Sequence, residues 1–289
     1  MGRKLCTRTQ QGIFAALDLD SLKIRGALEK KGESLSVKGS RIGLGAFLDL
    51  DLPRRPEIRV PLRIALDADY FKNTLGSRLK IRSLDGNLAH VPLHAGGDIN
   101  SLGRDSTRVD AQIQIKDCPL DTLLGEYGVE FFAKASDFGT NGRASLDLKA
   151  KGVLSGESYP EIDACFRSAP SRVYYYPMDF RGRLVADLDA SLSSSGKLDL
   201  DVREFDTVFP GLSFSLGGNV SDLLGKDTHM DIRSDAGISL DTLMKWIPDN
   251  LGIDASGYVE TSIIADAYRS NLTKYDFEKA FFQADINAG

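Results

Sequence analysis

Pairs of aspartates separated by one residue recur along this 289-residue sequence. Side chains two positions apart on a β-strand point to the same face, so each pair would present two carboxylates together. Paired carboxylates suit calcium binding or general acid–base catalysis. The intervening residues are regularly Leu or Ala, however, so we interpret the pairs as the solvated side of amphipathic strands. The pairs are Asp18/Asp20, Asp49/Asp51, Asp67/Asp69, Asp187/Asp189 and Asp199/Asp201.

Other catalytic and ligand-binding patterns are incomplete. His90 and His94 are four residues apart in a strand-and-turn context, without a Cys or a third His to complete a zinc site. The segment Gly211–Ser215 lacks the final glycine of a G-x-S-x-G nucleophile elbow. The segment Gly43–Gly45 lacks the third glycine and the helix of a dinucleotide-binding loop. We therefore expect a protein that is not an enzyme and that uses no cofactor or metal.

The cysteines and a tyrosine cluster have ordinary structural interpretations. Cys6, Cys118 and Cys165 are too few and too scattered for a disulfide scaffold. We interpret Cys118 and Cys165 as buried thiols, and the sequence leaves open whether they pair in an oxidising compartment. The run 174–176 of three tyrosines, with Phe180, suits a sugar-stacking surface, but we favour a strand whose alternate rings pack.

Composition narrows the class of protein. Hydrophobic residues make up 42% of the chain and charged residues 27%, which is typical of a globular protein. The net charge of −5 argues against nucleic acid as a partner. The longest apolar stretch, Ile13–Leu17, is far too short to span a bilayer, and the first residues lack the apolar core of a signal peptide. We expect a fragment of a longer protein, with its membrane anchor outside this chain.

Alternation of apolar and polar residues dominates the sequence. Such a period of two indicates strands with one apolar and one solvated face, which are typical of antiparallel sheets. Many strands with short connections favour a meander. The sequence therefore predicts a mainly β fold, an elongated, curled antiparallel sheet that forms a repeating groove. The clearest alternating runs are 48–52, 58–66, 109–115, 144–150, 184–192, 198–202 and 212–216.

Turns and helices are predicted at a few points. Asp85-Gly86, Asn141-Gly142 and Gly217-Gly218 are dipeptides that favour tight hairpin turns. Short helices are expected over 119–127 and 240–247, and more weakly over 70–75. None is long enough to cover an extended sheet. The apolar face must then be covered by a second sheet, by curling or by a ligand.

An internal repeat supports an array of β units. The segment Leu120–Leu124 reappears as Leu240–Met244, and each is followed by a glycine-led strand. We expect an N-terminal β-groove region over 1–118, a β repeat over 119–238, and the start of a further repeat over 239–289.

The region from about Val109 onward resembles the AsmA-like family of diderm-bacterial envelope proteins, which is related to TamB. The resemblance lies in PLDTLL and SLDTLM, in NGRASLDLKAKG with a following Tyr-Pro, in RGRLVADLDASL and GKLDLDV, and in FPGLSFSLGGNVSDL. It implies an inner-membrane-anchored protein on the periplasmic face of that membrane or spanning the periplasm. It also implies a role in phospholipid transport between membranes and in outer-membrane assembly. This chain departs from the family pattern because it lacks the anchoring helix.

The resemblance and the alternation together predict a groove whose floor binds phospholipid acyl chains. The expected lining residues are Ile113, Ile115, Leu146, Leu148, Leu184, Ala186, Leu188, Leu198, Leu200, Val202, Leu212, Phe214 and Leu216. Two other hypotheses stay open: a structural or adhesive β-sandwich with the same residues as core, and a carbohydrate-active or calcium-dependent β protein that uses the aspartate pairs and tyrosines.

Overall fold

The structure is a computed structural model, and it describes residues 4–8, 14–52, 55–74, 76–88, 91–101, 106–122, 137–156, 158–176, 179–225, 227–244, 256–273 and 277–289. These residues fall into two compact units. The first holds the described residues of 1–118 and 146–162, and the second holds those of 119–145 and 163–289. This division follows spatial contacts, and the repeats expected from the sequence stay a prediction.

The first unit is built of strands. They are β1 (Lys4–Arg8), β2 (Phe14–Lys31), β3 (Ser34–Leu52), β4 (Arg55–Asn73), β5 (Gly76–Leu88), β6 (Val91–Asn100), β7 (Thr107–Pro119) and most of β9 (Arg143–Leu154). Within this unit the strands are hydrogen-bonded in chain order, from β1 to β7 and then to β9. The neighbouring strands from β1 to β7 all pair antiparallel.

The second unit repeats this construction with short helices between some strands. It holds α1 (Leu120–Thr122), β8 (Phe138–Thr140), most of β10 (Glu161–Tyr175), β11 (Phe180–Leu192), β12 (Leu198–Phe209), β13 (Leu212–Ser221), β14 (His229–Ser239), α3 (Leu240–Met244), β15 (Tyr258–Tyr268), α4 (Arg269–Thr273), the 3₁₀ helix η5 (Phe277–Lys279) and β16 (Phe281–Ala288). The strands β10 to β16 are hydrogen-bonded in chain order, and β8 pairs with β10.

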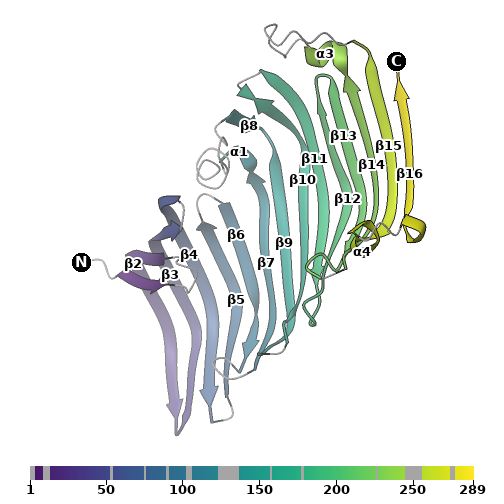
Figure 1. Cartoon of the computed structure of the whole chain (residues 1–289). Coiled ribbons are helices and arrows are strands. Elements are labelled where there is room, and N and C mark those ends of the chain that lie inside the picture. The colour runs from purple at the N-terminus through teal and green to yellow at the C-terminus, as the bar shows by residue number, and fades with distance from the viewer. Residues whose placement is uncertain are drawn as a thin grey trace. The chain divides into compact units, whose positions relative to one another are not determined.

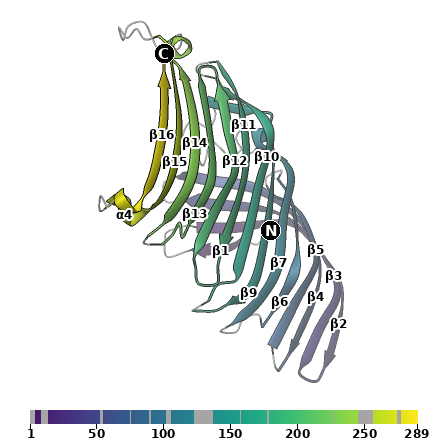
Figure 2. The same ribbon diagram turned by 90° about the vertical axis from the view of Figure 1, so that its right-hand side faces the viewer.

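The predicted fold class is confirmed. The protein is mainly β, its strands form an antiparallel meander, and its described helices are short. Each alternating run singled out in the sequence lies in a strand. Within the second unit the strands bend along their length, so that its sheet is curled (Figures 1 and 2).

The weakest helix prediction is wrong. Residues 70–73 continue strand β4, and Tyr70 lies opposite Leu79 of β5. The aromatic residues Tyr70 and Phe71 favour a pleated, half-buried surface over a helix. The two other predicted helices begin where expected, as α1 and α3, and their remaining residues beyond 122 and 244 lie outside the described residues.

None of the three predicted hairpin turns is present. Asp85-Gly86 lies inside β5 and Gly217-Gly218 lies inside β13. Asn141-Gly142 connects β8 to β9, which both pair with β10 rather than with each other. At Gly217-Gly218 the reason is close backbone approach. A Cβ atom on Gly218, whose φ is +129°, would lie 2.7 Å from the Cα atom of Ile232 on β14. Glycine within a strand often marks such an approach or a β-bulge.

The internal repeat adopts the same local structure at both places. In α1 the backbone N–H of Leu120 donates to the carbonyl oxygen of Gly142 at 2.9 Å, and in α3 the N–H of Leu240 donates to that of Gly257 at 2.8 Å. Each helix follows a strand, β7 or β14, and each glycine precedes the next long strand. The repeated sequence therefore encodes a repeated strand–helix–strand connection.

Candidate functional site

One face of the second unit's sheet is largely apolar, and its hydroxyl side chains are Thr207, Ser234 and Thr261. Residues paired in register on antiparallel strands share a face. In one such row Ala186 of β11 pairs with Phe205 of β12, Phe205 with Leu216 of β13, and Leu216 with Ser234 of β14. A bulge at Arg203 and Glu204 of β12 inverts the alternation there, which keeps Val202 and Phe205 on the same face.

This apolar face contains every lining residue predicted from β11 to β13. Its members are Leu184, Ala186, Leu188, Ala190 and Leu192 of β11, Leu198, Leu200, Val202, Phe205 and Phe209 of β12, Leu212, Phe214, Leu216 and Val220 of β13, Met230, Ile232, Ala236 and Ile238 of β14, Val259, Ile263, Ala265 and Ala267 of β15, and Phe282, Ala284, Ile286 and Ala288 of β16. Sequence reasoning missed the residues of β14 to β16, although the alternation is present there too.

The first unit has its own apolar face. Ile113 of β7 pairs with Ala95 of β6, Ala95 with Leu84 of β5, and Leu84 with Leu66 of β4. Ile115 alternates with Ile113 and shares its face. The amide groups of Gln112 and Gln114 donate hydrogen bonds to Asp147 of β9, at 2.7 to 3.1 Å. Asp147 therefore lies on the polar face.

Strand alternation then assigns the last two predicted lining residues. Leu146 and Leu148 flank Asp147 on β9, so they lie on the apolar face with Ile113 and Ile115. Within each unit, the structure places the predicted residues of that unit on one face.

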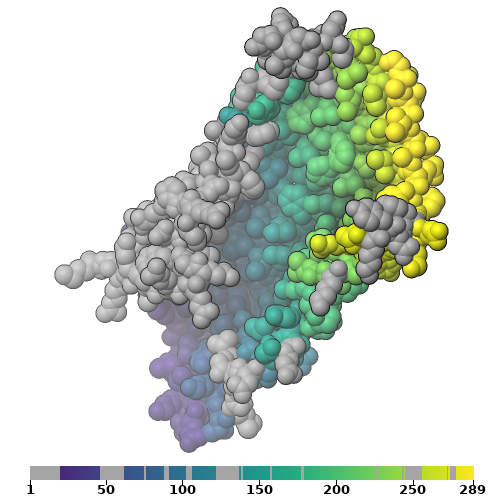
Figure 3. All heavy atoms as spheres, in the orientation of Figure 1, coloured from purple at the N-terminus to yellow at the C-terminus, as the bar shows by residue number. Residues whose placement is uncertain are grey.

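The apolar face is only partly covered. In the part of the chain that the structure describes, no large side chain is completely buried. The best-buried members of the face in the second unit are small, such as Ala267 and Ala186, while Ile263 is 41% exposed and Ile286 is 70% exposed. The described strands of this unit belong to one sheet, and Figure 3 shows one of its faces, green to yellow, open along much of its length. A packed sandwich would bury its large core residues.

A hollow of about 850 Å³ crosses β11 to β16 of the second unit. Its charged lining residues are Arg183, Asp206, Asp235, Glu260 and Asp285, which lie on the polar face by register. Its lining also includes Phe214, Ala236, Ala284 and Ile286 of the apolar face, and of these only Phe214 was a predicted lining residue. The hollow therefore borders residues of both faces.

On the polar faces, two arginines bond aspartates of the predicted pairs, and we call these contacts arginine clamps. Arg82, at a bulge of β5, bonds both Asp67 and Asp69 of β4. Arg203, at the bulge of β12, bonds Asp189 of β11. These carboxylates are thus engaged in charge-assisted hydrogen bonds within the sheet, as expected for a solvated structural face.

The pKa values of three aspartates reflect these contacts. The backbone N–H of Gly39, which donates to Asp69 at 2.8 Å, and the Arg82 guanidinium lower the pKa of Asp69. Arg78 lowers the pKa of Asp98, and the backbone N–H of Asp222 lowers the pKa of Asp199. These groups are therefore held as carboxylates, and none is tuned for general acid catalysis near neutral pH.

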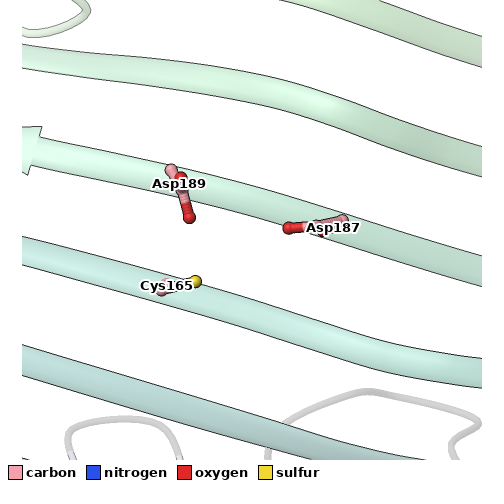
Figure 4. Close-up of side chains that lie close together, drawn as sticks. All are labelled: Cys165, Asp187 and Asp189. Atoms are coloured by element: carbon pink, nitrogen blue, oxygen red, sulfur yellow. The ribbon is translucent and has the colours of Figure 1, made fainter.

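A cluster of Cys165, Asp187 and Asp189 resembles a metal-ligand set. Their ligand atoms lie within 4.8 Å of one another, and Figure 4 shows the Cys165 sulfur on β10 directed toward β11. Two cations balance the carboxylates, because Arg167 lies 3.4 Å from Asp187 and Arg203 bonds Asp189. The hydrogen bond to Asp189 and burial raise the pKa of the Cys165 thiol, which disfavours a reactive thiolate. We interpret the cluster as part of an ion-pair network.

The described histidines pair with aspartates of adjacent strands. His94 Nδ1 lies 2.7 Å from Asp85, and His229 Nε2 lies 2.7 Å from Asp266. His90 and Cys6 fall outside the residues whose side chains are described. Cys118 is a buried thiol and Cys165 a half-buried one.

The tyrosine run does not form a uniform surface. Tyr174 and Tyr175 are half-buried, whereas Tyr176 is 62% exposed. The ring of Phe180 lies on the apolar face, 6.5 Å from that of Phe209. The rings at this end of β10 and β11 thus differ in both burial and face.

Comparisons with known proteins leave the family open. No family model, curated protein or solved structure matches this chain. Among the described helices, none is long and apolar enough to cross a bilayer.

Proposed function

We propose that this chain is a non-enzymatic lipid-binding sheet segment whose apolar face holds the acyl chains of phospholipids. The observation that carries the proposal is the continuous apolar face from β11 to β16, which has large, partly exposed side chains. Exposed apolar surface of this extent marks a binding surface in a soluble protein.

The free energy gained by burying acyl chains is large enough for lipid binding. Each methylene group removed from water contributes about 0.8 kcal/mol, so burial of about a dozen methylenes contributes roughly 10 kcal/mol before entropy costs. The face carries no charged side chain between β11 and β16, and acyl chains need none. Equivalent apolar rows from strand to strand would let a chain move along the sheet, as a conduit requires.

The sequence resemblance to AsmA-like proteins supports a proposed cellular context for this surface. In this proposal the chain belongs to a periplasmic protein that is anchored in the inner membrane by a segment outside this chain. Its role is phospholipid transport between membranes and outer-membrane assembly. The alternative is a structural or adhesive β-sandwich protein of the envelope, in which the same residues form a sealed core.

The test introduces one carboxylate on either face. Leu216 and Ser215 are neighbours on β13 and lie on opposite faces. The purified wild-type chain should carry phospholipid that mass spectrometry detects after solvent extraction. Leu216→Asp should lower the amount of bound lipid at least fivefold without unfolding, while Ser215→Asp should retain it.

Two results would contradict the proposal. One is wild-type protein without lipid, and the other is equal lipid in both variants. If Leu216→Asp unfolds the chain and Ser215→Asp does not, the apolar face is a packed core, and the sandwich alternative is favoured.

A further inference from the structure

The two parts of the chain carry opposite net charge. Residues 1–118 hold 20 Lys and Arg against 14 Asp and Glu, whereas residues 119–289 hold 16 against 27. Although the whole chain is acidic, its first part is therefore basic. The cations of the first unit that share one face are candidates for an anion-binding surface.

Four cations lie close together on that face, and we name them the basic patch: Lys23 and Arg25 of β2, Arg41 of β3 and Arg63 of β4. Arg25 lies directly opposite Arg41 in register. Like charges in such a pair repel one another, so an anion that binds between them relieves the repulsion. The nearest described carboxylate, Asp67, lies 3.8 Å from Arg41 and is also bonded by Arg82.

The patch includes an open position on β3. Lys23 lies opposite Gly43, and Arg63 lies opposite Gly45. A Cβ atom on Gly43 would have only the Cβ of Lys23 within 4 Å, so the space above this glycine is open, whereas the Ser21 hydroxyl and the Asp20 carboxylate lie close to Gly45. The open backbone at Gly43, beside Lys23, allows a phosphate group to approach closely.

The other side of β2 favours a bilayer over other anionic partners. Leu22, Ile24 and Leu28 lie on the opposite face of β2 from Lys23 and Arg25, and their exposed fractions are 53%, 65% and 71%. Among the described strands, β1 pairs with β2 only over Phe14–Asp18, so the rest of β2 is an edge of the sheet. An edge strand with exposed cations on one face and exposed aliphatic side chains on the other can enter the interface of a membrane edgewise. A nucleic acid or an acidic protein would leave these aliphatic groups in water.

We propose that the basic patch and the exposed aliphatic residues of β2 dock the first unit on a bilayer that contains anionic phospholipids. The headgroup phosphates contact Lys23, Arg25, Arg41 and Arg63, and Leu22, Ile24 and Leu28 enter the interfacial region. This goes beyond the holding of acyl chains, because it concerns other residues and an intact membrane.

The experiment measures co-sedimentation of the chain with vesicles. The wild type should bind phosphatidylglycerol vesicles at least tenfold more tightly than phosphatidylcholine vesicles. Each cation near an anionic surface contributes roughly a fivefold gain in affinity. The variant K23Q/R25Q/R41Q/R63Q should therefore lose at least tenfold in affinity. Raising the salt from about 0.1 M to about 0.5 M should release the wild type, because screening shortens the range of the attraction.

A matched variant removes the same charge from the second unit. R172Q/R181Q/R183Q/R233Q should bind phosphatidylglycerol vesicles at least as well as the wild type. Circular dichroism of both variants serves as the control for correct folding. The lipid retained on purification, measured by mass spectrometry, reports separately on the apolar face, so that each proposal can fail alone.

Three results would overturn the docking proposal. They are equal binding to both kinds of vesicle, equal losses in the two quadruple variants, and a concentration-dependent oligomer that K23Q/R25Q/R41Q/R63Q dissolves without any vesicle binding. The last result would assign the patch to a second copy of the chain.

Discussion

At the scale of single residues, the described aspartate pairs act as structural groups, while Asp18/Asp20 and Asp49/Asp51 include side chains outside the described residues. Arg82 bonds Asp67 and Asp69, and Arg203 bonds Asp189. Two carboxylates on one strand face repel each other, and the guanidinium placed between strands relieves that repulsion. The same residue types that suggested calcium or acid–base chemistry therefore stabilise the solvated face of the sheet.

The Asp69 carboxylate should make stability depend on acid. Its pKa is lowered in the folded chain, so its contribution is present above the unfolded-state value of about 3.9 and is lost as the pH falls below it. Asp69→Asn should be less stable than the wild type at pH 7, and the difference should shrink toward pH 3. Urea unfolding at both pH values checks this. A difference that is constant with pH would show that Asp69 does not contribute through its charge.

Removal of an arginine clamp should have a modest, salt-sensitive effect. Arg82→Gln leaves Asp67 and Asp69 facing each other, and exposed ion pairs contribute about 0 to 1 kcal/mol. We expect a small loss in the free energy of unfolding at low salt and a smaller loss at high salt. Arg181→Gln, which removes a more exposed pair with Asp179, is the control and should have no measurable effect. Equal effects of the two variants would refute the clamp.

At the scale of elements, a bulge opposite a glycine pair recurs in both units. Arg82 and Ser83 of β5 oppose Gly96 of β6, and Arg203 and Glu204 of β12 oppose Gly217 of β13. The next glycines, Gly97 and Gly218, have φ values of +154° and +129°. The bulge restores the apolar residues to one face after the extra residue, so it maintains the face rather than interrupting it.

Gly218 should tolerate no side chain. A Cβ atom there would clash with the backbone of Asp231 and Ile232, and its φ is strained for other residues. Gly218→Ala should lower the free energy of unfolding by roughly 2 to 4 kcal/mol. Gly217→Ala is the matched control, since its nearest neighbour would lie 3.6 Å from the new Cβ. Thermal unfolding of both variants measures the difference in stability. Similar melting temperatures would contradict this account of the bulge.

The strands could be predicted from the sequence, and their connections could not. Alternation over 184–192 or 109–115 depends only on neighbouring residues, and both runs are strands. The glycine pair 217–218 has the composition of a hairpin turn, but its position is decided by contact with β14, the next strand of the sheet. Tyr70 likewise lies in a strand, opposite Leu79 of β5. Pairing with a neighbouring strand therefore overrides local turn and helix signals.

The apolar face was predictable only in part for the same reason. Leu200 and Leu216 stand out as members of alternating runs. Phe205 does not, because the bulge at Arg203 and Glu204 changes its phase, and only the register reveals that it shares their face. The basic patch was also missed, because its cations come from three strands and are brought together by pairing.

At the scale of the whole molecule, each unit presents an apolar face on one side of its own strands and charged groups on the other. The described residues enclose no large, fully buried side chain, and stability therefore comes from strand pairing and from side chains that touch their neighbours on the same face, as Phe205 and Phe214 do at 6.2 Å between ring centroids. In the proposed function, a ligand rather than a second protein layer completes such a surface.

The most direct test of this account is photocrosslinking from the two faces of one strand. A benzophenone amino acid placed at Leu200 of β12 would lie on the apolar face, and one placed at Asp201 on the polar face. In chain purified from a bacterial envelope, the account predicts a phospholipid adduct, identified by mass spectrometry, from position 200 and none from position 201. Adducts from both positions, or from neither in folded protein, would contradict it.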